Sequence, residues 1–206
     1  MKLSRCIEYS FHRAQTVFRA QASLIFLWIP KTAGTSVYRW LSTEVGMRHL
    51  NHFKLFRADH GLASDSTRPL TAGHQNIDAL IRHGLIDQES LNSSEMRSFA
   101  FVRNPFVRQV SNWRNMIRNR EIPSSFTFEE YLELAFRERV GIGPWNFYST
   151  SGASPMHLWV YQSRWPGPRV VLKVEEMAYS VSLLREMLGI DGEPRHLNRA
   201  PSSLAP

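Results

Sequence analysis

Three short runs of apolar residues, each followed by a helical pattern, set out the predicted fold. The runs lie at 23–29 (SLIFLWI), 98–102 (SFAFV) and 169–174 (RVVLKV), and each has the continuous apolar character of a strand buried on both faces. A shorter run at 69–72 predicts a fourth strand. Apolar residues at helical spacing predict helices over 35–45, 76–83, 105–120, 126–139, 156–162 and 178–188. Alternating strands and helices predict an α/β fold of three layers with a central parallel sheet.

The segments between these elements have no clear periodicity. Residues 1–22 are predicted to be an N-terminal arm or peripheral helix, and residues 23–206 a single domain. Residues 49–65 are expected to be irregular, as are residues 194–206. Residues 141–154 form a loop rich in Gly, Pro and Ser, whose aromatic residues either stack on sugar rings or cap the core.

Composition narrows the class of protein. The chain has 206 residues, of which 43% are hydrophobic, as in ordinary soluble domains. Its single cysteine, Cys6, excludes an intramolecular disulfide and a cysteine-based zinc site. No apolar run reaches the length of a membrane span, and 24–29 is too short for a signal-peptide core, so we expect a cytoplasmic protein. The net charge of +7 favours an anionic partner.

A loop of small and polar residues joins the first predicted strand to the first predicted helix. Small residues let backbone N–H groups turn inward around an anion, and a helix N-terminus adds its positive dipole end. We therefore expect a phosphate group to bind here, at Lys31, Thr32, Ala33, Gly34, Thr35 and Ser36. The alternative is a tight turn with a solvated lysine.

The order of residues distinguishes this loop from the phosphate loop of ATPases and GTPases. That loop requires G-x-x-x-x-G-K-[ST], with the lysine after the second glycine. Here Lys31 precedes Gly34 by three positions, and the first glycine is missing. A P-loop kinase is the alternative enzymatic function. It would also need a carboxylate for magnesium, and none is evident in the sequence.

A second motif follows the strand predicted at 98–102. Arg103 ends this strand, and Ser111 lies about two turns into the next helix, for which Asn104 is the expected N-cap and Pro105 the first residue. The carboxyl edge of a parallel sheet is where ligands bind in open α/β folds. A guanidinium and a hydroxyl at that edge suit a second phosphate, separate from the first. The alternative is an exposed arginine and an ordinary helix serine.

Together the two motifs, PKTAGTS at 30–36 and RNPFVRQVSNW at 103–113, resemble those of sulfotransferases that use 3′-phosphoadenosine-5′-phosphosulfate (PAPS). The motif variant is most similar to carbohydrate sulfotransferases of the membrane-Golgi and bacterial type, and the resemblance covers most of the chain from about residue 24. It implies a P-loop-nucleotidase-like sulfotransferase fold, PAPS as donor, adenosine 3′,5′-bisphosphate (PAP) as product, and no metal. It assigns the 5′-phosphosulfate to Lys31, Gly34, Thr35 and Ser36, and the 3′-phosphate to Arg103 and Ser111.

Sulfuryl transfer to a hydroxyl also requires a base, and a histidine suits that role. His74 is the first choice, because the pair Gly73-His74 ends a short apolar run and resembles the Gly-His pair of uronyl 2-O-sulfotransferases. His60 is the second choice. Arg199 lies where relatives place a C-terminal loop over the nucleotide, so the resemblance makes it a further candidate for the 3′-phosphate.

The basic residues beyond these motifs leave two interpretations open. Arg114, Arg118 and Arg120 follow Ser111 on the same predicted helix, either lining a channel for an acidic polysaccharide or forming a solvated face. The charge also leaves a nucleic-acid-binding module as the non-enzymatic alternative. The basic residues are dispersed, however, so nucleic acid is not expected as a partner. The resemblance implies a hydroxyl-bearing acceptor, and its motif variant favours a glycan. Oligomeric state stays open.

Overall fold

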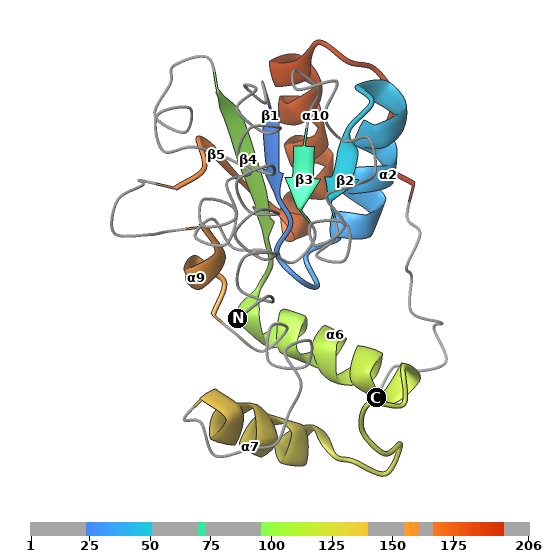
Figure 1. The fold of residues 1–206 in the computed structure, drawn as a ribbon, viewed down its shortest axis with the longest axis vertical. Helices are drawn as coiled ribbons and strands as arrows, with labels where there is room; N and C mark the ends of the chain where they lie inside the picture. The colour runs from blue at the N-terminus through green and yellow to red at the C-terminus, as the bar shows by residue number, and fades with distance from the viewer. Residues whose placement is uncertain (1–23, 51–69, 73–95, 140–154, 161–166, 196–206) are drawn as a thin grey trace, which may run out of the picture.

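The computed structural model describes residues 24–50, 70–72, 96–139, 155–160 and 167–195. Within these ranges lie five strands, all parallel, in the order β2-β3-β1-β4-β5 (Figure 1). The strands are β1 (Leu24–Leu27), β2 (Arg48–Leu50), β3 (Leu70–Ala72), β4 (Arg97–Val102) and β5 (Val170–Lys173). The helices are α2 (Gly34–Glu44), α6 (Pro105–Arg118), α7 (Phe128–Arg139), α9 (His157–Val160) and α10 (Met177–Leu188), with a 3-10 turn, η2, at Val174–Glu176.

The predicted α/β class, the parallel sheet and the four predicted strands are confirmed. Two details of the prediction are wrong. Residues 49 and 50 were predicted to be irregular, but they belong to β2, a three-residue strand at the edge of the sheet. The strand predicted as buried on both faces at 169–174 is β5, which forms the opposite edge, so Val171 is 44% exposed. The predicted arm at 1–22, the helix at 76–83 and the loop at 141–154 lie outside the described residues.

The core forms on both faces of the neighbouring strands β1 and β4. On one face, the rings of Phe26 and Phe99 stack with their centroids 4.9 Å apart, and side chains of α2 and α10 pack over them. On the other face, Ile25, Leu27 and Ala100 are also buried. Because side chains alternate across a strand, burial of both sets shows that β1 and β4 are covered on both sides.

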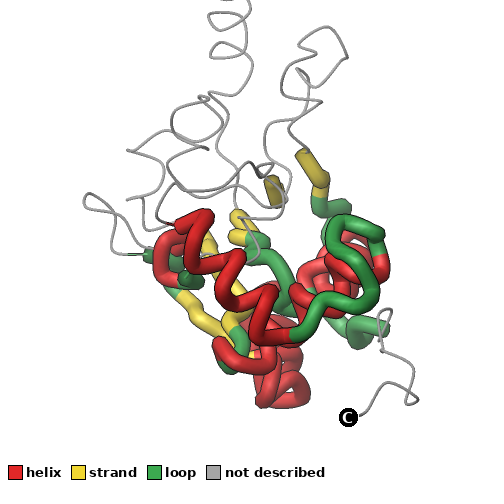
Figure 2. The backbone as a smooth tube through the Cα atoms, turned by 90° about the horizontal axis from the view of Figure 1, so that it is seen from below, coloured by secondary structure: helices red, strands yellow, loops and turns green. Residues whose placement is uncertain are grey.

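Helix α6 crosses below the carboxyl ends of the strands, and α7 lies beneath it (Figure 1). Seen from below, helices (red) lie in front of the strands (yellow) (Figure 2). A small second core of Met116, Ile122 and Tyr131 joins α6 to α7. The Tyr131 hydroxyl completes this contact, since it accepts from Asn112 Nδ2 at 3.0 Å and donates to Gln109 Oε1 at 2.6 Å.

The sheet order creates a switch point between β1 and β4. After β1 the chain passes through α2 to β2 on one side of the sheet, and after β4 it passes through α6 to β5 on the other side. In open α/β sheets, ligands bind outside the carboxyl ends of strands whose connections diverge in this way. The fold therefore directs attention to the two segments that leave β1 and β4.

Candidate functional site

Two strand-to-helix corners meet at this switch point. The first corner is residues 28–36, between β1 and α2, and the second is residues 103–111, from the end of β4 into α6. The pair Leu27↔Ala100 belongs to the register of β1 with β4, and extending it by three residues brings Pro30 level with Arg103. Side chains confirm this alignment, because Arg103 Nη1 donates to the Lys31 carbonyl at 3.3 Å and Arg108 Nε donates to the Pro30 carbonyl at 2.9 Å.

The first corner contains two left-handed residues that are not glycine. Lys31 has φ 68° and Ala33 has φ 61°, a conformation that costs an L-residue about 1–2 kcal/mol. Thr32, between them, is fully buried and its hydroxyl donates to the Ile29 carbonyl at 2.9 Å. The Thr32 hydroxyl proton is thus used within the loop, so any contact of Thr32 with an anion falls to its backbone N–H.

The N-terminus of α2 leaves backbone donors open. Ala33 is the N-cap and makes no side-chain capping bond, and its carbonyl accepts from Ser36 N and Val37 N. Among the described residues, the N–H groups of Thr32, Ala33, Gly34 and Thr35 have no hydrogen-bond partner. Unsatisfied N–H groups at a helix N-terminus, with its positive dipole end, form an anion-binding site.

Gly34 is required here for a steric reason. A Cβ built on Gly34 would overlap the indole ring of Trp28, which stacks on Tyr38 with ring centroids 5.7 Å apart. The aromatic stack therefore packs directly against the backbone at the start of α2. Any residue with a side chain at this position would require Trp28 or the start of α2 to shift.

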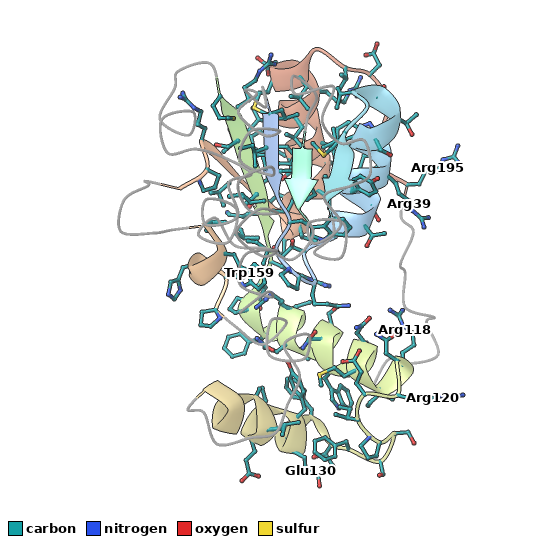
Figure 3. The ribbon with its side chains drawn as sticks, viewed as in Figure 1. Arg39, Arg118, Arg120, Glu130, Trp159 and Arg195 are labelled. Carbon is teal, nitrogen blue, oxygen red and sulfur yellow. The ribbon has the colours of Figure 1, made fainter. Side chains whose placement is uncertain are left out.

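The Lys31 ammonium lies in a cationic environment. Burial, together with the positive charges of Arg118 and Arg103, lowers the pKa of Lys31 to about 8, although Glu121 acts in the opposite direction. Arg118 stands near the C-terminal end of α6 (Figure 3). An anion bound among these cations would offset their mutual repulsion, so their arrangement favours a negatively charged ligand.

The second corner satisfies its own backbone donors. The Asn104 side chain accepts from Phe106 N at 3.0 Å and from Val107 N at 3.3 Å, and Pro105 has no N–H. The expected N-cap is thus confirmed. The Asn104 N–H in turn donates to Glu175 Oε1 at 2.7 Å. An anion at this corner must therefore be held by side chains rather than by the helix N-terminus.

Arg103 and Ser111 are the side chains available for that purpose. Burial lowers the pKa of Arg103 and the nearby Glu175 carboxylate opposes the shift, but the guanidinium stays charged. Helical spacing places Ser111 on one face of α6 together with Arg108, Asn115 and Arg118. Since Arg108 contacts the first corner and Arg118 acts on Lys31, this face is turned toward the phosphate loop.

The predicted residues of both motifs thus come together at one sheet edge. His74, His60 and Arg199 lie outside the described residues, although β3 ends at Ala72 beside β1, two positions before His74. Roles for Arg108, Glu175 and Trp28 were not predicted from the sequence. Arg108 lies inside the second motif, Trp28 inside the apolar run at 23–29, and Glu175 directly after the run at 169–174. The helical spacing of Arg108 from Ser111 was the one signal that related any of them to the site.

No described helix is long and apolar enough to cross a membrane. Across the same residues, no group of three or more His, Cys, Asp or Glu side chains is placed to hold a metal ion.

A family model and a solved structure are similar to this chain. A family model described as "Sulfotransferase family" matches residues 14–203. The crystal structure of a sulfotransferase from Alicyclobacillus acidocaldarius is similar with a TM-score of 0.53 and 16% sequence identity, covering 90% of this chain and 88% of that one. At this identity the likeness concerns the fold. No curated protein sequence matches the chain.

Proposed function

Because this chain belongs to the sulfotransferase family, we propose that its sulfate donor is PAPS and that it transfers the sulfuryl group to a carbohydrate hydroxyl. Family membership makes the chain an enzyme that moves sulfuryl groups from a donor such as PAPS to an acceptor. The hydrogen bond from Arg103 to the Lys31 carbonyl carries the proposal, because it joins two anion-binding corners into one site. A donor with phosphate groups at two ends fits such a site.

The open N–H groups of the first corner suit the 5′-phosphosulfate. Thr32, Ala33, Gly34 and Thr35 supply backbone donors, Ser36 supplies a hydroxyl, and Lys31 supplies the charge. The side chains of Arg103 and Ser111 suit the 3′-phosphate, with Arg199 as a further candidate. No metal is needed for this division, since cationic side chains and backbone N–H groups provide the positive charge at both ends.

The residues of the first corner also suit the chemical step. The donor supplies an activated sulfuryl group, and the acceptor oxygen displaces its phosphate in line. Negative charge then grows on the oxygen that bridges to the leaving phosphate. Lys31 and the loop N–H groups stabilise this charge, and preorganised donors of this kind contribute about 10²–10³ in rate. By analogy with phosphoryl transfer, positioning and electrostatics provide most of the catalysis.

The acceptor hydroxyl must lose a proton, and we assign this role to His74, with His60 as the second choice. In support, β3 ends at Ala72 beside β1, so the chain leaves this strand at the same edge as the phosphate loop. A His74→Ala variant is expected to keep its affinity for PAP and to lose turnover. Turnover equal to the wild type would remove His74 from the role.

Two measurements test the proposed function. In the first, the thermal stability of the protein is compared with PAP, ATP-Mg²⁺ and GTP-Mg²⁺. Stabilisation by PAP alone is expected, whereas stabilisation by ATP-Mg²⁺ alone would favour a kinase. In the second, radiolabelled PAPS is incubated with glycans, lipids and phenols. Label is expected on a glycan, and label on a phenol or lipid alone would contradict the carbohydrate acceptor.

A further inference from the structure

The second motif contains an arginine that the proposed function does not use. Arg108 is 1% exposed, and its Nε donates to the Pro30 carbonyl at 2.9 Å, across from α6 to the first corner. Burial lowers the pKa of Arg108 to about 10, against the effect of Tyr131. Burying a guanidinium costs desolvation free energy, so filling space with an apolar side chain would serve stability better. The hydrogen bond to the first corner offers a reason for an arginine here.

The bonded carbonyl belongs to the peptide that precedes Lys31. Peptide groups are planar, so the backbone at Lys31 is set by the orientation of the two peptide planes on either side of its Cα. Arg108 holds the first plane through the Pro30 carbonyl, and Arg103 holds the second through the Lys31 carbonyl. Both arginines therefore act on the residue whose φ of 68° is unusual for an L-amino acid.

We propose that Arg108 is a positioning residue, which keeps Lys31 in its left-handed conformation and so holds the phosphate loop ready for an anion. The inference rests on the proposed function for the identity of that anion. It explains why the R-x-x-x-x-R spacing of the second motif matters to the first. The first arginine is assigned to the ligand and also bonds to the loop, while the second is assigned to the loop and not to the ligand.

A matched pair of variants isolates the hydrogen bond. Glutamine at position 108 places an N–H donor at the same point along the side chain as the arginine Nε, whereas methionine places a methyl group there. Arg108→Gln and Arg108→Met are thus close in shape and differ in the donor. Arg185→Met, on α10, is the control for losing an arginine away from the site.

One readout does not depend on any ligand. The chain has four lysines, Lys2, Lys31, Lys54 and Lys173, so their side chains can be followed individually by NMR. The wild-type Lys31 is expected to titrate near pH 8, given its burial and the charges of Arg118, Arg103 and Glu121. In Arg108→Met the released loop exposes Lys31 to water, and its pKa is expected to rise toward 10.5. Arg108→Gln and Arg185→Met should leave it near 8.

The second readout is affinity for PAP, measured by calorimetry on variants with a cooperative unfolding transition. Arg108→Met is expected to bind about tenfold more weakly, as for the loss of one hydrogen bond to the loop, and Arg108→Gln to bind like the wild type. Equal behaviour of the Gln and Met variants in both readouts would overturn the proposal. If Arg108→Met does not fold, Arg108→Gln decides, since a folded Gln variant with a shifted Lys31 pKa contradicts it. A wild type that does not bind PAP would refute the proposed function instead.

Discussion

The two corners leave neighbouring parallel strands, yet they begin their helices in opposite ways. At the first corner, two left-handed residues precede α2 and no side chain caps the helix, so its N–H groups stay open. At the second corner, Asn104, Pro105 and Glu175 satisfy or remove the corresponding donors. The comparison indicates that a strand-to-helix corner keeps backbone N–H groups available for an anion only where its helix is left uncapped. At a capped corner, an anion would depend on side chains.

The largest effect is expected from removing the charge of Lys31 at the first corner. Lys31→Met keeps the backbone donors and removes the charge that stabilises the leaving group. We expect kcat to fall by about 10²–10³, the loss found for one preorganised donor at a developing charge. Steady-state assays with PAPS and the acceptor check this. Lys173→Met is the control, because Lys173 is exposed and pairs with Glu176. Wild-type turnover in Lys31→Met would refute the role of the ammonium.

The next largest effect is expected on stability, from the close contact between Gly34 and Trp28 at the first corner. In Gly34→Ala the new methyl overlaps Trp28, and overpacking of this kind costs about 1–3 kcal/mol of unfolding free energy. Gly46→Ala provides the control, since Gly46 has φ +64° and nothing within 4 Å of its missing Cβ, so only backbone strain of about 1–2 kcal/mol is expected there. Denaturant unfolding measures both. Equal losses would mean that Trp28 can move aside.

The cap at the second corner predicts a smaller effect, confined to stability. Asn104→Ala removes two hydrogen bonds from the start of α6, for an expected loss of about 1 kcal/mol. Thr127→Ala, which removes the cap of α7 through Glu130 N, should cost about as much. Neither change should weaken PAP binding, because these N–H groups do not reach the ligand. A tenfold weaker PAP complex in Asn104→Ala alone would place the cap inside the site.

The smallest expected effect is on pH dependence. The free protein holds Lys31 with a pKa of about 8, and a bound anion should raise it, so PAP binding takes up a proton between pH 8 and 10. At pH 8 about half of the molecules carry the charge, and affinity should be about half its value at low pH. Since the folded pKa lies below the unfolded one, this group makes the free protein more stable as pH rises from 8 to 10.5. Calorimetry in buffers of different ionisation enthalpy measures the proton uptake, and none at pH 8–9 would contradict the coupling.

Continuous apolar runs predicted the central strands, because a strand buried on both faces admits few polar residues. Edge strands need not be apolar throughout. The three residues of β2 (RHL) therefore showed no strand-like hydrophobic pattern, and β5 was predicted to be more buried than it is. Which strands form the edges depends on the order of strands in the sheet, which long-range packing decides.

Dependence on long-range packing also limited what could be predicted about the site. The prediction that Arg103 and the phosphate loop share one edge is confirmed, since it needed only the parallel direction of the strands. The roles of Arg108 and Glu175 depend on the register between neighbouring strands, which the local pattern does not contain. The left-handed conformation of Lys31 was not predicted either, because an L-residue such as lysine has no local preference for it.

The most direct measurement compares affinities for PAP and for adenosine 5′-monophosphate, which lacks the 3′-phosphate, in the wild type, Lys31→Met and Ser111→Ala. If the first corner holds the 5′ end and the second the 3′ end, Lys31→Met weakens both ligands. Ser111→Ala then weakens PAP about tenfold, as expected for a hydrogen bond to a charged group, and leaves adenosine 5′-monophosphate unchanged. If Ser111→Ala weakens both ligands equally, or neither, the two corners do not divide the nucleotide between them.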